Sequence, residues 1–367
     1  MRIYVAGTRG IPEVLGGVEK HCEHLYPLMV KDDLNITVIA RSPYVKYISS
    51  QYKRVKLRSI WAPKKKSIEA IIHTFLAALY SKKNGADVMH IHAVGPGLLV
   101  PFCKLIGLKV VFTHHGPDYD RQKWGVFAKF ILKLGERLAV KYADEVIVIS
   151  NVINELIKHK YGRKDAHLIY NGVEPFSANK LDPLPYFSRH KLEPRQYIVA
   201  VGRFVEEKGF HDLINAYEKT SQKIKLVIIG DADHPTKYSE ELKSAVKDNE
   251  NIHLTGFIKG DELSSIFSHA ATFVMPSYHE GLPIALLEAM SYSLPVIISD
   301  IPANKEVGLD KDSYFKTGSV NDLAQLLEYS FLKEFSAINY SKYLENYQWN
   351  DIAIKTENVY ERLLPSR

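Results

Sequence analysis

Cysteines and long apolar runs are scarce in this chain. Its 367 residues include only two cysteines, Cys22 and Cys103, which lie far apart in the sequence. A disulfide framework or a cysteine-rich zinc site needs more cysteines at closer spacing, so both are excluded and a reducing compartment is expected. No apolar run reaches about 18 residues, the length of a membrane-spanning helix, and the first residues lack a signal-peptide pattern. We therefore expect a cytoplasmic protein without a membrane span.

Signatures of nucleic-acid binding and of dinucleotide binding are also missing. The sequence contains no helix-turn-helix, zinc-finger or RNA-recognition motif, so no nucleic-acid partner is expected. The glycines after the first apolar segment do not have the GxGxxG spacing that binds a dinucleotide, which makes a dehydrogenase a weak interpretation. Short repeats and low-complexity tracts are absent too. A chain longer than roughly 250–300 residues exceeds a single core, so two domains are expected.

Charge is unevenly distributed along the chain. Residues 1–180 contain 28 Lys and Arg against 15 Asp and Glu, a net charge of +13, whereas residues 181–367 contain 20 against 27, a net charge of −7. The two values add to the total of +6. A basic first half and an acidic second half indicate that the first half meets an anionic surface. An anionic membrane face or a lipid phosphate is favoured over nucleic acid.

A lysine cluster followed by a helical apolar pattern gives this surface a candidate location. Lys64, Lys65 and Lys66 precede apolar residues at positions 68, 71, 72, 75, 76 and 79. This pattern is typical of a helix that lies in a membrane interface. It is equally typical of an amphipathic helix that packs on a sheet beside a solvated lysine cluster. The sequence leaves these two interpretations open.

Short apolar segments alternate with amphipathic ones in both halves of the chain. This alternation predicts a doubly wound α/β fold, whose ligands bind at the carboxyl ends of the strands. In the first half we expect strands at residues 3–6, 36–40, 87–91, 110–113 and 145–149, and helices at residues 18–30, 68–81, 97–105 and 126–142. In the second half we expect strands at residues 197–201, 225–229, 252–254, 272–275 and 295–298. Prolines at positions 183, 185 and 194 mark the connection between the halves.

The segment from Glu280 to Met290 is the most informative part of the sequence. It is a loop that turns into a helix, with Pro283 near the first helical position, where a missing N–H costs nothing. The helix start offers free N–H groups and a positive dipole end, which suit a diphosphate. Glu288 is a charge within an apolar run, and a buried carboxylate needs hydrogen-bond donors, such as two ribose hydroxyls. The alternative is a helix-start charge at Glu280 and a salt-bridged core residue at Glu288.

Glycines and histidines follow the expected strands of the first half. Gly16 and Gly17 come after the first strand, where small residues let backbone amides approach a phosphate or a sugar. A flexible turn without a ligand is the alternative. His114 and His115 stand before Gly116 at a later strand end and can reach into a cleft, although a surface histidine pair has the same pattern. Metal binding by this pair is poor because adjacent strand residues point to opposite faces.

Cations follow the first expected strand of the second half. Arg203 offers a rigid donor fork and Lys208 a point charge near a helix start, so both suit a diphosphate. The alternative is that they pair with the neighbouring glutamates. Asp231 and Asp233 could hold a divalent ion on a nucleotide diphosphate. Because aspartate is common in turns after strands, we interpret these two as turn residues and predict no metal site.

Together these segments resemble a family 4 glycosyltransferase with the GT-B architecture, and the resemblance covers nearly the whole chain. Its most specific parts are residues 202–203 with 207–209, residues 276–277 with 280–288, and residues 299–304. The start of the chain, including Gly16, Gly17 and Glu19, and the segment 118–124 are similar to a subgroup of bacterial polysaccharide enzymes that includes rhamnosyltransferases. The chain has two histidines where the family often shows a single His or Asp before Gly, and alignment to the Gly selects His115. Pro117 is a second departure, because a bulkier apolar residue is usual there.

The resemblance implies an α/β fold with two Rossmann-like doubly wound domains that face each other across a cleft. The implied N-terminal, acceptor-binding domain spans residues 1–182, and the implied C-terminal domain, which binds the nucleotide sugar, spans residues 183–349. A C-terminal helix at about residues 350–367 is expected to pack back on the first domain. The implied reaction is the retaining transfer of a hexosyl or rhamnosyl group.

The resemblance also implies roles for individual residues. In the family mechanism the leaving phosphate accepts the proton of the acceptor, so the protein needs no nucleophile and stabilises the charge of the diphosphate. The implied catalytic residues are His115, Glu280, Arg203 and Lys208. The implied donor-binding residues are Gly16, Gly17, Ile258, Leu282, Pro283, Ile284 and Glu288, and the implied acceptor-side residues are Asp118 and Arg121. Cationic side chains replace a metal, so no cofactor is expected.

The implied partners are a UDP- or dTDP-linked sugar and a saccharide acceptor carried on a lipid. The expected role is the synthesis of a bacterial surface polysaccharide, with the protein bound peripherally to the anionic inner face of the membrane. A nucleotide-sugar epimerase of the same architecture is one alternative, and an inactive partner subunit of a transferase is another. The intact Arg203, Lys208, Glu280 and Glu288 argue against the inactive subunit.

Overall fold

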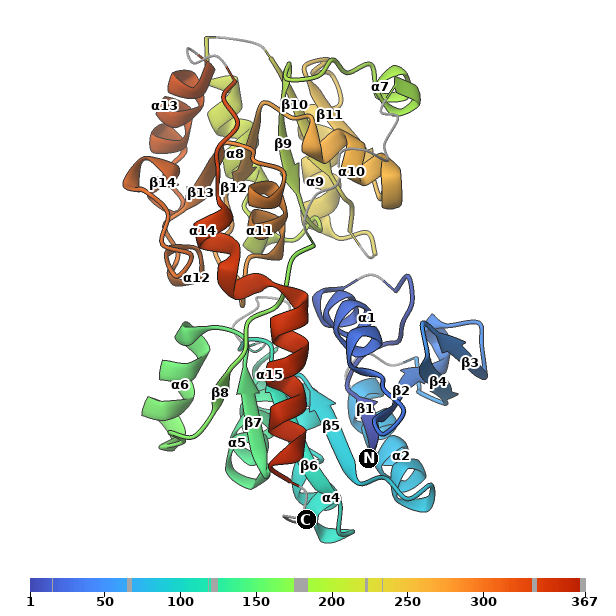
Figure 1. The fold of residues 1–367 in the computed structure, drawn as a ribbon. Coiled ribbons are helices and arrows are strands. Elements are labelled where there is room, and N and C mark those ends of the chain that lie inside the picture. The colour runs from blue at the N-terminus through green and yellow to red at the C-terminus, as the bar shows by residue number, and fades with distance from the viewer. Residues whose placement is uncertain are drawn as a thin grey trace. The chain divides into compact units, whose positions relative to one another are not determined.

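A computed structural model gives the fold of the chain (Figure 1). It describes residues 1–14, 16–64, 68–117, 119, 125–174, 184–221, 224–232, 234–331 and 335–363. The chain divides into two compact units: unit 1 contains Met1–Gly172 and Asn346–Arg367, and unit 2 contains Val173–Glu345. The chain therefore leaves unit 1 once and returns to it with its last helix.

Unit 1 is built on an eight-stranded sheet with the order β3-β4-β2-β1-β5-β6-β7-β8. Its strands are β1 (Arg2–Ala6), β2 (Asn35–Arg41), β3 (Ser49–Tyr52), β4 (Val55–Ile60), β5 (Val88–His92), β6 (Lys109–His114), β7 (Glu145–Val148) and β8 (His167–Leu168). Neighbouring strands are parallel, except that β3 and β4 form an antiparallel hairpin at one edge. The central strands are buried on both faces, which explains their apolar sequences.

Helices cover both faces of this sheet. They are α1 (Gly17–Met29), α2 (Glu69–Lys83), α3 (Val94–Gly97), α4 (Val100–Leu105), α5 (Val126–Tyr142), α6 (Asn151–Tyr161) and α15 (Trp349–Glu361), with a short helix η1 (Ser42–Tyr44). The chain runs from β1 to β2 in one direction and from β4 through β5 and β6 to β7 in the other. Right-handed crossovers therefore place α1 on one face and α2 to α5 on the other. The contacts agree, because α1 packs against α15 whereas α3 and α4 pack against α5.

Unit 2 repeats the architecture with a six-stranded parallel sheet in the order β11-β10-β9-β12-β13-β14. The strands are β9 (Tyr197–Val201), β10 (Lys225–Ile229), β11 (Ile252–Gly256), β12 (Thr272–Met275), β13 (Val296–Ser299) and β14 (Tyr314–Phe315). The helices are α7 (Leu184–His190), α8 (Phe210–Glu218), α9 (Lys237–Val246), α10 (Gly260–Ser268), α11 (Ile284–Ser291), α12 (Pro302–Lys305), α13 (Val320–Phe331) and α14 (Ser341–Leu344), with short helices η4 (Glu206–Lys208), η5 (Lys311–Ser313) and η6 (Glu345–Tyr347).

The expected doubly wound pattern is confirmed, and every expected strand is present. The structure differs from the expectation at two places: it adds a hairpin, β3–β4, and it divides one expected helix into two. The β3–β4 hairpin has a polar first strand and turns at Lys53 and Arg54, whose positive φ angles replace the usual glycine signal. The helix expected at residues 97–105 is two helices, α3 and α4, because Pro101 lies in the first turn of α4 and cannot donate to the preceding turn.

Helix α2 packs small and polar residues against the sheet and exposes large apolar ones. Its buried residues are Glu69, His73, Thr74, Ala77, Ala78 and Ser81. The large apolar residues Phe75 and Leu79 are exposed instead, as is Ile68 just before the helix. The apolar stripe that the sequence showed therefore faces away from the sheet. Among the described residues, no helix is long and apolar enough to cross a membrane.

Each sheet has a point where the strand order reverses. In unit 1 this point lies between β1 and β5, and in unit 2 between β9 and β12. The chain leaves these neighbouring strands in opposite directions, and ligands of doubly wound sheets bind outside the carboxyl ends of the strands at such a point. Two groups of polar residues stand at these points.

Candidate active site

The first group lies in unit 2, after strand β9. The strand ends at Val201, and Gly202 and Arg203 lead into the short helix η4, which contains Lys208. A Cβ atom on Gly202 would lie 3.4 Å from the Lys208 side chain. Gly209 then has a φ of +65°, and a Cβ atom there would lie 2.2 Å from the carbonyl oxygen of Pro276. Glycine at position 209 therefore lets this loop approach the end of β12.

Glu280 and Lys208 meet between these two loops. Lys208 Nζ lies 2.6 Å from Glu280 Oε1, and the hydroxyl of Ser277 donates to the same oxygen at 2.7 Å. Lys208 therefore pairs with Glu280 and not with a neighbouring glutamate of η4. Glu280 Oε2 has no partner among the residues that the structure describes. One carboxylate oxygen is thus fixed by two donors while the other can accept a hydrogen bond from a ligand.

Ser277 is itself held by a buried network. Its carbonyl oxygen accepts a hydrogen bond from Ser299 Oγ at 2.5 Å. Asn304 donates from Nδ2 to the Ser299 carbonyl oxygen at 2.8 Å. These three residues come from the ends of β12 and β13 and from α12, and all are buried. The sequence resemblance included residues 276–277 and 299–304, and the structure gives this part of the motif a positioning role around Glu280.

The start of α11 presents backbone amides next to Glu280. Pro283 is the residue before the helix and has no N–H, and the Ile284 amide donates to the Leu282 carbonyl oxygen at 3.0 Å. The next two amides, of Ala285 and Leu286, have no backbone acceptor within the described part of the chain. Two free amides at a helix start attract an anion. The expected helix start is present, but its free donors lie one or two residues later than Leu282–Ile284.

The remaining expected residues of unit 2 are more dispersed. Glu288 lies on α11, one turn after the free amides, and is partly exposed. Ile258 follows the end of β11 and is also partly exposed. Asp231 accepts from its neighbouring Ala232 amide at 2.7 Å and pairs with Lys243 at 2.7 Å. These contacts are those of a turn residue, while Asp233 lies outside the described residues.

The second group lies in unit 1, where Gly16 and Gly17 open helix α1. Gly16 has a φ of +146°, and a Cβ atom there would lie 2.0 Å from Glu19 Oε2. Apart from its chain neighbours, no described residue would lie within 4 Å of a Cβ atom on Gly17. Glu19 folds back and accepts from the Arg9 amide at 2.8 Å, so its charge is directed into the loop after β1. The exposed start of α1 is thus open to an anionic ligand.

The structure separates the two adjacent histidines. His114 is fully buried and bonds through Nε2 to Glu136 Oε1 at 2.8 Å. Burial would raise the pKa of Glu136, but hydrogen bonds from His114, Lys160 and Tyr161 outweigh it and lower the pKa to about 2. His115, in contrast, is partly exposed just after β6. His114 therefore has a structural role, whereas His115 keeps part of its surface exposed.

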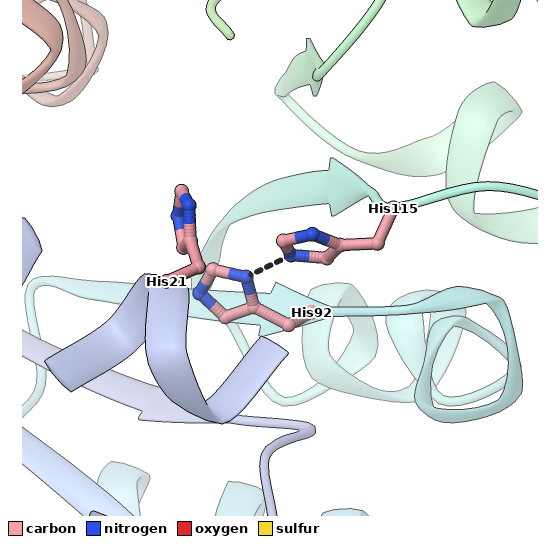
Figure 2. Close-up of side chains that lie close together, drawn as sticks. All are labelled: His21, His92 and His115. Carbon is pink, nitrogen blue, oxygen red and sulfur yellow. Dashed lines mark hydrogen bonds between the residues drawn. The ribbon is translucent and has the colours of Figure 1, made fainter. Parts of the chain in front are cut away.

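His115 belongs to a cluster of three histidines (Figure 2). His92, at the end of β5, contacts it with a distance of 2.8 Å between His92 Nδ1 and His115 Nε2. The His21 ring, from helix α1, lies 5.1 Å from that of His115. Burial lowers the pKa of all three histidines, to about 4 for His21. We refer to His21, His92 and His115 as the three-histidine cluster.

Sequence reasoning missed two members of this cluster. His92 is followed by Ala93, whose φ of +69° is rare for a residue with a side chain. Gly7, at the end of β1, lies so close to the backbone of His92 that a Cβ atom on Gly7 would be 2.1 Å from the His92 carbonyl oxygen. A histidine at a strand end was a visible signal, but the contribution of His21 from a helix was not. Asp118 and Arg121, expected on the acceptor side, lie outside the described residues.

The two units match two glycosyltransferase families. The family model "Glycosyltransferase Family 4" matches residues 15–175, and the model "Glycosyl transferases group 1" matches residues 186–347. The chain belongs to the family 4 glycosyltransferases of GT-B architecture. The glycine-rich start of α1 lies in the first matched region, and Arg203, Lys208 and Glu280 lie in the second.

Relatives and solved structures agree with this assignment. A glycosyltransferase of Methanocaldococcus jannaschii is 25% identical over 98% of this chain and 98% of its own. The O-antigen chain mannosyltransferase RfbU of Salmonella typhimurium is 32% identical over 52% of this chain and 50% of its own. The crystal structure of Anabaena HepE with UDP and glucose has a TM-score of 0.80 at 14% identity, covering 99% of this chain and all of that one. The last likeness shows the shared fold.

Proposed function

We propose that this glycosyltransferase moves a sugar, with retention of configuration and without a metal, from a nucleotide-diphosphate sugar to a lipid-linked saccharide. The product would extend a bacterial surface polysaccharide. The observation that carries the donor part of this proposal is the arrangement of Lys208, Ser277 and Glu280 beside the start of α11. It brings a cation, an oriented carboxylate and free amides to the point where the strand order of unit 2 reverses.

The proposed chemistry assigns the diphosphate to the cations and amides. When the bond between the sugar and the diphosphate breaks, negative charge grows on the leaving oxygen. Arg203, Lys208 and the amides of Ala285 and Leu286 would stabilise that charge. Preorganised donors of this kind commonly supply several kcal/mol of transition-state stabilisation each. The leaving phosphate would take the proton of the acceptor hydroxyl, so no protein nucleophile is required.

Glu280 and Glu288 would recognise the two ends of the donor. Ser277 and Lys208 fix Glu280 Oε1, so Oε2 is left to accept from a hydroxyl of the donor sugar. Glu288 would accept from both ribose hydroxyls, with the base lying near Ile258. Gly16 and Gly17 would admit the diphosphate to the start of α1, and His115 would contact the transferred sugar. HepE was solved with UDP and glucose, which favours a UDP-sugar for this chain too.

The exposed residues on one face of unit 1 favour the proposal of a lipid-linked acceptor. Helices α2, α4 and α5 share this face, and Phe75 of α2 packs on Phe102 of α4 with ring centroids 4.8 Å apart. Phe127 and Phe130, in the first turns of α5, are 77% and 61% exposed. Leu105 at the end of α4 is 84% exposed. Single exposed apolar side chains are normal, but several large ones on neighbouring helices are typical of a surface that meets a partner.

Basic residues accompany these apolar ones. Lys82, Lys83, Lys109, Lys133, Arg137 and Lys141 are exposed on the same helices and strand ends. Exposed apolar side chains flanked by cations fit an anionic bilayer surface, and the exposed stripe of α2 favours the interfacial interpretation over packing alone. The start of α5 follows the segment 118–124, where acceptor-side residues are expected. The proposed place of action is therefore the cytoplasmic face of the membrane.

A donor panel tests the central proposal. The full chain is incubated with UDP- and dTDP-linked sugars, and its melting temperature and the release of nucleoside diphosphate are measured. A ligand that binds only the folded state must raise the melting temperature. One class of nucleotide should therefore stabilise wild type, and it should stabilise the Arg203→Ala variant much less. Stabilisation by no nucleotide would overturn the proposal. Release of a free epimerised sugar without acceptor would favour the epimerase.

A further inference from the structure

We propose that the three-histidine cluster is a binding site for a divalent transition metal of the zinc class, and that a metal bound there inhibits the enzyme. One ring nitrogen of each of His21, His92 and His115 lies within 4.8 Å of the others. The three side chains come from α1, β5 and the loop after β6, so the fold and not a local motif brings them together (Figure 2). All three belong to unit 1.

The chemistry of the donors suits such an ion. Imidazole nitrogen is a preferred ligand of zinc, copper and nickel, and three histidines with an open fourth position form a common zinc site. No carboxylate takes part in this set, which disfavours calcium and magnesium. The ring nitrogen Nδ1 of His21 is buried and has no hydrogen-bond partner among the residues that the structure describes. An orphaned buried nitrogen is costly for a purely structural histidine.

The surroundings of the cluster resemble the outer shell of a metal site. Ligating histidines usually bond through their second nitrogen to a neighbouring group that fixes the ring. His92 does so, because its Nε2 lies 2.5 Å from the Tyr26 hydroxyl. That hydroxyl also lies 3.1 Å from His90 Nδ1, and His90 in turn contacts Tyr360 at 2.7 Å. The ring of His92 is therefore oriented with Nδ1 toward His115.

Metal entry requires only small movements. His92 Nδ1 and His115 Nε2 are now 2.8 Å apart and share a hydrogen bond. In a tetrahedral zinc site with bonds of about 2.0–2.1 Å, ligand nitrogens lie about 3.3–3.4 Å apart. The pair must open by about half an ångström while His21 moves closer. His115 is partly exposed, which gives the ion a path and leaves room for water at the fourth position.

Inhibition follows from the place of His115. This part rests on the proposed function, in which His115 contacts the transferred sugar. An ion on His115 Nε2 would fix the ring within the cluster and would add positive charge beside the transferred sugar. The site is therefore separate from any metal requirement of the transfer. Binding and inhibition are measured independently, so failure of one assay does not decide the other.

Binding is tested with zinc and cobalt on the metal-free full chain, in the absence of donor. Calorimetry should show one zinc ion per chain, and cobalt should give the intense visible absorption of tetrahedral coordination. The variants His21→Gln, His92→Gln and His115→Gln should each weaken zinc binding at least about tenfold, because the loss of a ligand costs no less than the loss of an outer-shell partner. Tyr26→Phe should weaken it less, by releasing His92.

Matched controls distinguish the site from general histidine binding. The controls are His24→Gln and His159→Gln. His24 lies one turn further along α1, where its ring stacks on Trp349. His159 is exposed on α6 beside Glu155. Both should bind zinc as wild type does. Circular dichroism and urea unfolding verify that each variant folds, and the partly exposed His115 supplies a test if the buried positions do not tolerate Gln. Equal zinc affinity of wild type and the three cluster variants, or no binding by wild type, would overturn the proposal.

In the transfer assay, micromolar zinc should lower the rate of wild type and excess EDTA should restore it. His21→Gln should need at least about tenfold more zinc for the same inhibition. Zinc that binds with one-to-one stoichiometry and leaves the rate unchanged would contradict the inhibitory part and retain the site. A protein inactive with every donor would instead contradict the proposed function.

Discussion

Lys208 and Glu280 form an ion pair between the loops that follow β9 and β12, with 2.6 Å from Nζ to Oε1. Both side chains are mostly buried, at 20% and 13% exposure. Each was assigned from the sequence to a different part of the donor, the lysine to the diphosphate and the glutamate to the sugar. Their contact means that the charge of one positions the other before the donor arrives.

Removal of the cations should reduce catalysis more than folding. Arg203→Ala and Lys208→Ala should each lower kcat/KM by roughly 10²–10³, because each removes a donor to the charge that grows on the diphosphate. Steady-state kinetics on the best donor measures this. Lys237→Ala is a matched control, since Lys237 is exposed at the start of α9 and pairs with Glu241 on the same helix. Near wild-type turnover in both site variants would place the donor site elsewhere.

The two glutamates should differ in what they affect. Glu288→Gln should weaken the binding of nucleoside diphosphate by about 1.5–3 kcal/mol, since a charged acceptor of ribose hydroxyls is lost. Glu280→Gln should leave this affinity nearly intact and lower turnover, because its free oxygen is assigned to the sugar. Isothermal titration and kinetics separate the effects, with Glu241→Gln as the control. An unchanged affinity of the Glu288→Gln variant for nucleoside diphosphate would contradict the assignment of Glu288 to the ribose.

Transfer should proceed without a metal. In the proposed function, Arg203, Lys208 and helix amides take the role that a divalent ion has in metal-dependent transferases. Asp231 pairs with Lys243 and accepts from the Ala232 amide within its own turn. Activity should survive excess EDTA, and it should rise if the preparation carries inhibitory zinc. The measurement is product formation with and without EDTA. Complete loss, restored by manganese or magnesium, would contradict the proposed donor site.

Vesicle binding should depend on both charge and apolar contact. The Lys64/Lys65/Lys66→Ser variant and the Phe127→Ser/Phe130→Ser variant should each sediment less with anionic vesicles than wild type does. Each lysine near such a surface contributes about 1 kcal/mol, and salt screens it. The control is Lys237→Ser/Lys247→Ser in unit 2, which should bind normally. Equal partitioning of all four proteins would mean that these side chains are only solvated.

Stability should fall as the pH drops below about 6.5. Burial lowers the pKa of His73 to about 4 and that of His90 to about 3, while both titrate near 6.5 in the unfolded chain. Between these values the unfolded state binds more protons, so the free energy of unfolding decreases as pH falls, by at most about 1.4 kcal/mol per pH unit for each histidine. Urea unfolding at pH 7.5, 6.5 and 5.5 in EDTA measures this. His73→Gln should reduce the slope, and a flat profile over this range would contradict the burial effect.

Much of the fold, and the position of the candidate donor-side residues at strand ends, could be predicted from the sequence. The strands are buried on both faces, so each one is a short run of apolar residues. Such a run can be recognised from the local sequence alone. Arg203, Lys208 and Glu280 stand at strand ends, and parallel strands bring their carboxyl ends to one edge of a sheet. The start of α11 was equally visible, because Pro283 ends the loop one residue before the helix.

Only the tertiary structure decided which of these residues touch and which neighbours join them. Glu280 pairs with Lys208 and accepts a hydrogen bond from Ser277. This arrangement depends on the close approach of Gly209 to Pro276. The outward apolar stripe of α2 exists because small and polar residues pack on the sheet instead. The three-histidine cluster combines residues that are 23 and 71 positions apart, held by a helix, a strand and a loop. Such contacts depend on strand order and helix placement, which no local pattern encodes.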